Sequence, residues 1–203
     1  MSAAQFLDGR LAQLQNLIKR EPDAYHDEFI LQHRHFQSEL EIFRLKPGKN
    51  SAHFAQLAYF LCQVSTCYPD DLAGLPELLA GLIEEHYDAL DPKVRITLVH
   101  SLILLRNRGV LGALPLFKTC FLLFRVQDKK LRKLLYSHVL ADIRGMHKKG
   151  GQQKELLGLQ SYLYGVLDDR NEAAAVKALE VMMELYRRQV REGERKSKGR
   201  MGG

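Results

Sequence analysis

Residues 91–109 read DPKVRITLVHSLILLRNRG, a largely apolar run that follows an Asp-Pro pair and two basic residues. The apolar part, residues 96–105, is too short to span a bilayer, which takes about 20 residues, and an arginine flanks it on each side. Asp91 is a good N-cap acceptor, and Pro92 falls at the first helical position, where its missing N–H would be unpaired in any case. The stretch therefore predicts a buried helix that begins at a capped turn.

The beginning of this helix recurs twice further along the chain. Residues 91–95 (DPKVR) are repeated as residues 128–132 (DKKLR), and residues 171–175 (NEAAA) form a weaker copy without the arginine. The spacings between the three copies are 37 and 43 residues, and similar apolar positions follow each copy. Helix pairs that recur at about 40 residues are typical of an α-solenoid of the HEAT or armadillo kind. The alternative is an irregular helical bundle with two coincidentally similar caps.

Apolar residues recur at steps of three and four residues almost throughout, and no segment alternates convincingly with period two. The sequence therefore predicts an all-α fold, a HEAT/armadillo-like α-solenoid of about nine helices. We expect Asn50 or Ser51 to cap the third helix. In repeats of this kind an aspartate and an arginine commonly pair between neighbouring repeats, which is a structural role. We assign this role of repeat cap to Asp91, Arg95, Asp128 and Arg132.

The residue patterns of common enzymes are absent from the sequence. There is no phosphate-binding loop, no dinucleotide-binding glycine motif, no HExxH zinc motif and no GxSxG nucleophile elbow. His33 and His35 are two residues apart on a predicted helix, so they point to different faces, which argues against a shared metal from that pair alone. The three cysteines are expected to be reduced core residues. We predict no enzyme, with no catalytic, cofactor or metal site and no small-molecule substrate or membrane partner.

Excess positive charge lies in two short parts of the chain, residues 128–154 and 187–203, and only the first is predicted to lie within folded structure. Residues 128–154 contain eight Lys/Arg and two Asp/Glu, and Gly145, Gly150 and Gly151 predict an exposed loop there. Such side chains can contact phosphates without reading bases. The alternative is an ordinary solvated face with cations favoured at a helix C-terminus. The candidate RNA phosphate contacts are Lys129, Lys130, Lys133, Lys148, Lys149 and Lys154.

Several short stretches, in one order, are similar to the N-terminal region of the SDA proteins, whose name abbreviates severe depolymerisation of actin. The resemblance covers about residues 10–189. The stretches that carry it include LQNLIKR at 14–20, SELEIF at 38–43, QVS at 63–65, CYP at 67–69, LDP at 90–92, LRK at 131–133 and ELYRR at 184–188.

This resemblance implies a nucleolar and nucleoplasmic assembly factor of the large ribosomal subunit. Family members resemble HEAT-repeat scaffolds, associate with precursor large-subunit particles made of ribosomal RNA and assembly factors, and are needed for maturation and export of those particles from the nucleus. The resemblance carries over no catalytic residue and no cofactor. The alternative left open is an adaptor in nuclear transport or the actin cytoskeleton that binds only proteins.

The end of the chain departs from the family pattern. Family members are far longer, so residues 1–189 are expected to be an N-terminal α-solenoid fragment. Residues 190–203 (VREGERKSKGRMGG) are polar and basic, and we expect them to be disordered. The dipeptide Val190-Arg191 can be encoded by GTG-AGG, the form of a splice donor, so we hypothesise that this tail is translated intron rather than native family sequence. A solenoid cut there is expected to self-associate through exposed Ala178, Met182 and Met183.

Overall fold

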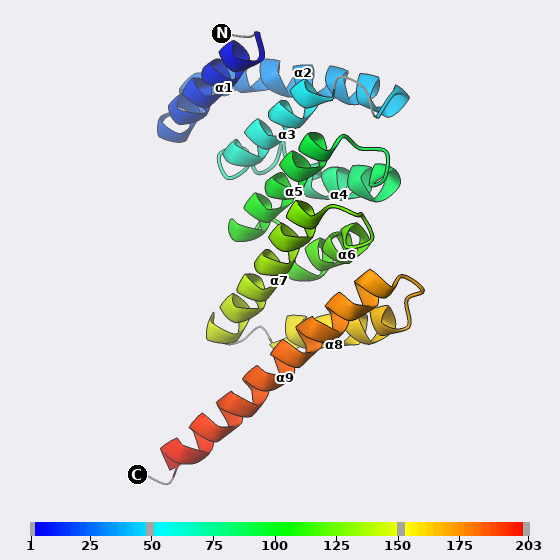
Figure 1. Cartoon of the computed structure of the whole chain (residues 1–203). Coiled ribbons are helices and arrows are strands. Elements are labelled where there is room, and N and C mark those ends of the chain that lie inside the picture. The colour runs from blue at the N-terminus through cyan, green and yellow to red at the C-terminus, as the bar shows by residue number, and fades with distance from the viewer. Residues whose placement is uncertain (1–2, 48–50, 150–152, 201–203) are drawn as a thin grey trace. The chain divides into compact units, whose positions relative to one another are not determined.

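Nine α-helices and one short 3-10 helix make up the described part of the chain, which contains no strand (Figure 1). The computed structural model describes the backbone of residues 3–47, 51–149 and 153–200 and the side chains of residues 9–47, 51–146 and 154–187. The prediction of an all-α chain is confirmed. The elements are α1 (Ala3–Arg20), η1 (Asp23–Tyr25), α2 (His26–Leu45), α3 (Ala52–Val64), α4 (Leu75–His86), α5 (Pro92–Asn107), α6 (Ala113–Leu123), α7 (Lys129–Lys149), α8 (Gln153–Leu167) and α9 (Glu172–Arg200).

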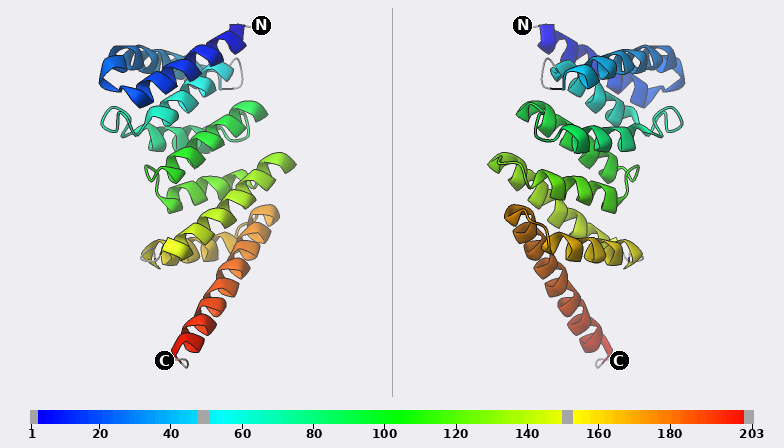
Figure 2. Two further views of the ribbon diagram at one scale, coloured as in Figure 1. Left: turned by 90° about the vertical axis from the view of Figure 1, so that its left-hand side faces the viewer. Right: turned by 90° about the vertical axis from the view of Figure 1, so that its right-hand side faces the viewer.

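The chain divides into two compact units, Met1–Leu116 and Phe117–Gly203. In the first unit α3 is central, since it packs against α1, α2 and α5, while α4 packs against α5 (Figure 2). The α3 sequence is apolar on most sides, and its Leu57, Leu61 and Val64 have no exposed surface. A helix that is apolar all round is one that other helices surround.

The helix predicted from the opening stretch is α5. Asp91 Oδ1 accepts hydrogen bonds from the backbone N–H groups of Lys93 at 2.8 Å and Val94 at 3.4 Å. Asp128 Oδ1 likewise accepts from Lys130 at 2.9 Å and Leu131 at 3.0 Å at the beginning of α7. Each carboxylate therefore satisfies two of the backbone donors that a helix N-terminus leaves unpaired.

The third copy of this turn is also a cap. Asn171 Oδ1 accepts from the N–H of Ala174 at 3.1 Å, directly before α9. The three sequence copies are therefore three structurally equivalent helix beginnings, which is what a repeat requires.

The repeat arginines make a different contact from the one expected. Arg95 Nη2 donates to the carbonyl oxygen of Leu90 at 2.7 Å, and Arg132 Nε donates to that of Val126 at 2.8 Å. Each arginine thus closes the turn that precedes its own helix, instead of pairing with an aspartate of another repeat. The reason is local: the carbonyl lies in the turn just before the helix, within reach of the guanidinium, and a buried or partly buried carbonyl needs a donor.

Helix α5 ends in a Schellman motif. The N–H of Val110 donates to Leu105 O and that of Gly109 to Arg106 O, both at 3.0 Å, and Gly109 has a φ of 77°. Glycine adopts this left-handed conformation without a steric cost, so the chain can reverse here. Arg108 then donates to the carbonyl oxygens of Cys62 at 2.9 Å and Gln63 at 2.6 Å, which ties the end of α5 to the end of α3.

In the second unit, one stripe of α7 is buried and α9 packs against both α7 and α8. The residues of that stripe recur at steps of three and four, as on an amphipathic helix. They are Leu131, Leu135, Val139, Ile143 and Met146, all of which are at most 2% exposed.

Three local features differ from the predictions in part or in full. Ser51 is the N-cap residue of α3, but its side chain makes no capping bond; its Oγ donates to Pro47 O at 3.1 Å, and Asn50 lies outside the described residues. Helix α7 continues through Gly145 to Lys149, where a loop was predicted, because one glycine costs only about 1 kcal/mol in a helix of good formers. Gly150 and Gly151 lie outside the described residues.

The third difference concerns the tail. Helix α9 continues to Arg200, so residues 190–200 are helical where disorder was predicted. Glutamate, lysine and arginine are strong helix formers, and a helix already begun extends more readily than a new one nucleates. Residues 201–203 lie outside the described part.

The three cysteines are free thiols, as predicted. Cys62 and Cys120 are fully buried, and burial raises the pKa of each to about 12. Thiols so protonated are poor nucleophiles. Among the described residues, no helix combines the length and the apolar character needed to cross a membrane.

Removing either capping carboxylate tests the repeat turn. Asp91→Ala and Asp128→Ala are each expected to lower the free energy of unfolding by about 1 kcal/mol, because two backbone N–H groups lose their acceptor. The measurement is denaturant unfolding of the whole chain followed by circular dichroism.

The matched control is Asp88→Ala, which removes an exposed aspartate just ahead of the same helix and no capping bond. It should change the free energy by less than about 0.5 kcal/mol. Equal effects of Asp88→Ala and Asp91→Ala would mean that charge, not capping, accounts for the loss.

Candidate functional site

The exposed side of α7 carries a row of basic side chains that we call the α7 basic face: Lys129, Lys130, Lys133 and Arg144. All four are exposed. Lys129 and Lys133 are one helical turn apart, and Arg144 follows Lys133 by about three turns, so these three side chains lie on one side. The row is roughly 22 Å long from Lys129 to Arg144 at 1.5 Å per residue. It lies opposite the buried stripe of the same helix.

The other three predicted contacts are placed differently. Lys148 and Lys149 belong to the last turn of α7, and their side chains lie outside the described residues. Lys154 is exposed in the first turn of α8, on a separate helix. Arg144, which was not among the named candidates, is the residue that the helical continuation of α7 adds to the face.

Neighbouring carboxylates set how much of this charge is available. Arg144 Nη2 is 3.8 Å from Glu184 Oε1 of α9, so part of its charge is balanced. Among the described residues, no ion pair forms with Lys129, Lys130 or Lys133. Exposed lysines without an acidic partner are free to neutralise phosphates.

No aromatic platform accompanies the basic face. Tyr136, the aromatic residue of α7, is partly buried, and Lys177 Nζ lies 4.6 Å from its ring centroid. Burial, followed by the carboxylate of Glu180, raises the pKa of Tyr136. A ring covered in this way does not offer the stacking surface on which proteins read unpaired bases. The α7 basic face is therefore suited to contact with a sugar-phosphate backbone.

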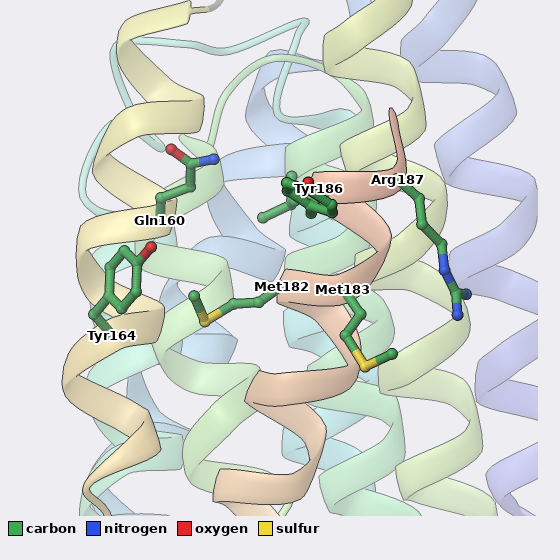
Figure 3. Close-up of a pocket in the computed structure, with 7 residues that line it drawn as sticks. Gln160, Tyr164, Met182, Met183, Tyr186 and Arg187 are labelled. Atoms are coloured by element: carbon green, nitrogen blue, oxygen red, sulfur yellow. The ribbon is translucent and has the colours of Figure 1, made fainter. Parts of the chain in front are cut away.

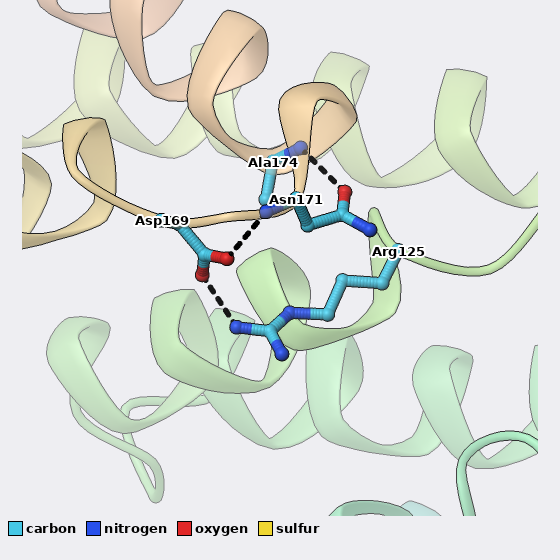
Figure 4. Close-up of polar contacts among 4 residues, drawn as sticks. All are labelled: Arg125, Asp169, Asn171 and Ala174. Carbon is cyan, nitrogen blue, oxygen red and sulfur yellow. Dashed lines mark hydrogen bonds and ion pairs between the residues drawn. The ribbon is translucent and has the colours of Figure 1, made fainter.

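An aspartate–arginine pair does link two repeats, but it is formed by Arg125 and Asp169 and not by the predicted repeat caps (Figure 4). Asp169 Oδ2 accepts from Arg125 Nη2, which lies in the turn after α6, and Asp169 Oδ1 accepts from the N–H of Asn171 at 2.8 Å. Asn171 in turn caps α9 at Ala174. The backbone hydrogen bond from Asn171 and the guanidinium of Arg125 lower the pKa of Asp169. This network joins the turn before α7 to the turn before α9.

A second surface feature lies between α8 and α9. Figure 3 shows Tyr164 on α8 opposite Met182 and Tyr186 on α9. Tyr164, Met183 and Tyr186 are 63%, 47% and 68% exposed. Together with other residues they form an open, mainly apolar pocket of about 340 Å³. The full lining is Gln160, Tyr164, Met182, Met183, Leu185, Tyr186 and Arg187.

The prediction that side chains in this part of α9 are exposed is only partly confirmed. Met183 is exposed and Met182 is half-buried, whereas Ala178 has no exposed surface. Ala178 shares the buried stripe of α9 with Ala174, Val181 and Leu185, and small side chains there let neighbouring helices approach. An open apolar pocket of this kind marks a place where another protein surface can pack.

Comparison with known sequences decides the family. The family model described as "SDA1, HEAT repeat" matches residues 60–197. The chain belongs to the SDA1 family. The match includes residues 190–197 of the predicted tail, and it agrees with the repeated capped turns, so the prediction of an all-α, HEAT-like solenoid is confirmed.

SDA1 relatives from distant organisms match most of the chain. It is 44% identical to "Protein SDA1 homolog" of Dictyostelium discoideum, over 89% of this chain and 24% of the relative. The corresponding protein of Xenopus tropicalis is 42% identical, over 91% of this chain and 27% of the relative. "Protein SDA1" of Chaetomium thermophilum is 31% identical, over 94% and 26%. The chain thus spans about a quarter of the length of these relatives, and none of their names denotes an enzyme.

The pH dependence of stability tests the inter-repeat network of this SDA1 chain. Because its pKa in the folded state is below the usual value of 3.8, Asp169 contributes stability that is fully present above pH 3.8 and is lost as the pH falls through the lowered pKa. Asp169→Asn should lower the free energy of unfolding by about 1 kcal/mol at pH 7. The difference in the free energy of unfolding between the wild type and Asp169→Asn should become smaller as the pH falls from 5 to 2.

The control for this experiment is Asp168→Asn, at the exposed neighbour that forms no part of the network. Urea unfolding curves recorded at each pH give the free energies. If the difference in free energy of unfolding between the wild type and Asp169→Asn stayed constant down to pH 2, the role assigned to the Asp169 carboxylate would be contradicted.

The apolar pocket predicts self-association. At high concentration the chain is expected to form dimers or larger species by light scattering, because Tyr164, Met183 and Tyr186 expose apolar surface. Met183→Glu should shift the mass toward that of a monomer. Leu45→Glu, at a leucine that is 82% exposed on α2, is the control and should leave the mass unchanged. A wild-type monomer at high concentration would count against this expectation.

Proposed function

We propose that this chain is a scaffold part of a non-enzymatic ribosome biogenesis factor that docks on precursor large (60S) ribosomal subunits in the nucleolus and nucleus. The whole protein is proposed to serve the maturation of these particles and their export from the nucleus. Membership of the SDA1 family supports the assignment through the resemblance described above. The observation that carries it for this chain is the α7 basic face, where three exposed lysines have no acidic partner among the described residues.

The α7 basic face supports contact with RNA phosphates rather than with bases. Its cations follow one side of a straight helix for roughly 22 Å, long enough to meet several phosphates of one RNA segment. Phosphate contacts position a protein without carrying sequence information. In this proposal the RNA partner is recognised by charge and shape, and Lys148, Lys149 and Lys154 remain further candidate phosphate contacts.

The second candidate is an adaptor in nuclear transport or the actin cytoskeleton that binds only proteins. The apolar pocket between α8 and α9 favours this reading, because exposed methionine and tyrosine side chains are typical of protein interfaces. The two candidates differ in their response to salt. Phosphate contacts weaken steeply as ionic strength rises, whereas apolar docking changes much less.

Gradient sedimentation of the tagged chain from nuclear extract tests the proposal, with a full-length SDA1 protein run beside it. The chain should co-migrate with precursor large subunits. Lys129→Glu/Lys130→Glu/Lys133→Glu should move it to the top of the gradient, because reversed charge repels phosphate. With purified ribosomal RNA, the same variant should reduce the slope of log affinity against log salt by about 2.

The matched control reverses three exposed cations of the first unit: Arg34→Glu/Lys46→Glu/Lys93→Glu. It changes the net charge equally and should leave co-migration intact. If both triple variants still co-migrate, the protein-only adaptor is favoured. If the wild-type chain stays at the top while the full-length protein sediments, this part of the chain does not dock by itself and the proposal fails.

A further inference from the structure

Two histidines and a glutamate converge between α2 and α3, far from the α7 basic face in the sequence. His53 Nδ1 is 3.3 Å from Glu39 Oε1, and His35 Nε2 is 3.9 Å from the same oxygen. One ligand atom from each of the three side chains lies within 4.8 Å of the others. The His35 and His53 rings are 4.8 Å apart between centroids. All three residues belong to the first unit.

Buried packing directly beneath these residues holds the two helices in register. The Phe36 ring stacks on Phe54 with centroids 5.4 Å apart, and Phe43 stacks on the same ring at 4.6 Å. Each is at most 2% exposed. Because Phe36 follows His35 and Phe54 follows His53 in the chain, the stack fixes where the two imidazoles emerge. The three polar side chains are therefore positioned by the core and not by a mobile loop.

We propose that His35, Glu39 and His53 bind one divalent transition-metal ion, with Zn²⁺ as the ion of choice. Imidazole nitrogen and carboxylate oxygen are the donors of open zinc sites, in which three protein ligands leave one position for water. Two ligands at about 2.0–2.1 Å from a tetrahedral ion lie roughly 3.3 Å apart, which is the separation of His53 Nδ1 and Glu39 Oε1. His35 is the most exposed ligand, and its Nε2, 3.9 Å from the same oxygen, has to move closer to reach this separation.

The bound ion would join α2 to α3 at the polar rim of the aromatic stack. Glu39 and His35 are one turn apart on α2, so their side chains point to one side, and His53 comes from the first turn of α3. Binding to the folded chain alone stabilises it by mass action. The site thus acts as a clamp on the helix pair and keeps one open coordination position at the surface.

The sequence pattern does not reveal this site, for an identifiable reason. His33 and His35 lie on different faces of one helix, whereas His35 and Glu39, four residues apart, lie on the same face. That spacing alone is common on helices. His53 joins the pair only when α3 folds back on α2, which no spacing within one helix reveals.

The test is direct metal binding to the untagged full chain. Competition with a chromophoric chelator should give one Zn²⁺ per chain, and Co²⁺ in its place should show the intense visible absorption of a tetrahedral ion. His53→Ala and Glu39→Gln should each weaken Zn²⁺ at least about tenfold, the lower limit found even for residues that only orient ligands. Zn²⁺ should raise the melting temperature of the wild type but not of these variants.

The control is His100→Ala, which removes an exposed histidine of α5 and should bind Zn²⁺ as the wild type does. Glu39→Gln keeps the size of the side chain, so it covers the case in which His53→Ala disturbs folding, and circular dichroism checks both. Absence of Zn²⁺ binding by the wild type would overturn the proposal. So would unchanged affinity in the Glu39→Gln and His53→Ala variants, since the ion would then bind elsewhere.

Discussion

The turn that begins α5 and α7 is the constraint on which the repeat depends. A helix that starts inside a packed structure must find acceptors for its first N–H groups, and the aspartate of the turn accepts two of them. The arginine four residues later donates to a carbonyl of the same turn. Each turn therefore supplies acceptors for two N–H groups of its helix and a donor for one of its own carbonyl groups. The turn therefore determines at which residue the helix begins and in which direction the apolar stripe of that helix points.

The basic face is a geometric consequence of that beginning. Once Leu131 and Leu135 are turned inward, side chains offset from them by about half a helical turn must face solvent. Lysine and arginine occupy those positions, and the uninterrupted helix through Gly145 aligns Arg144 with the lysines of the first turns. A loop at Gly145 would have broken the row. Helix continuity thus turns a local excess of charge into a linear surface.

The two surfaces of the second unit differ in the kind of partner that each one suits. The α7 basic face suits a polyanion, whose contact weakens with salt, whereas the pocket between α8 and α9 suits an apolar protein surface. The Asp169 network lies in the turns that connect these helices and uses a carboxylate to hold two repeats together. The buried, protonated thiols add to packing alone. In the proposed scaffold role, recognition by this SDA1 chain depends on which side chains its helices expose.

The sequence by itself determined the helical class, the capped turns at Asp91 and Asp128 and the region of positive charge, because periodicity and capping depend on residues close in the chain. The partner of each repeat arginine, the Arg125–Asp169 link and the convergence of His35 with His53 were decided by tertiary structure alone. Those contacts join residues whose distance depends on how one helix packs on another. Local pattern carries no information about that packing.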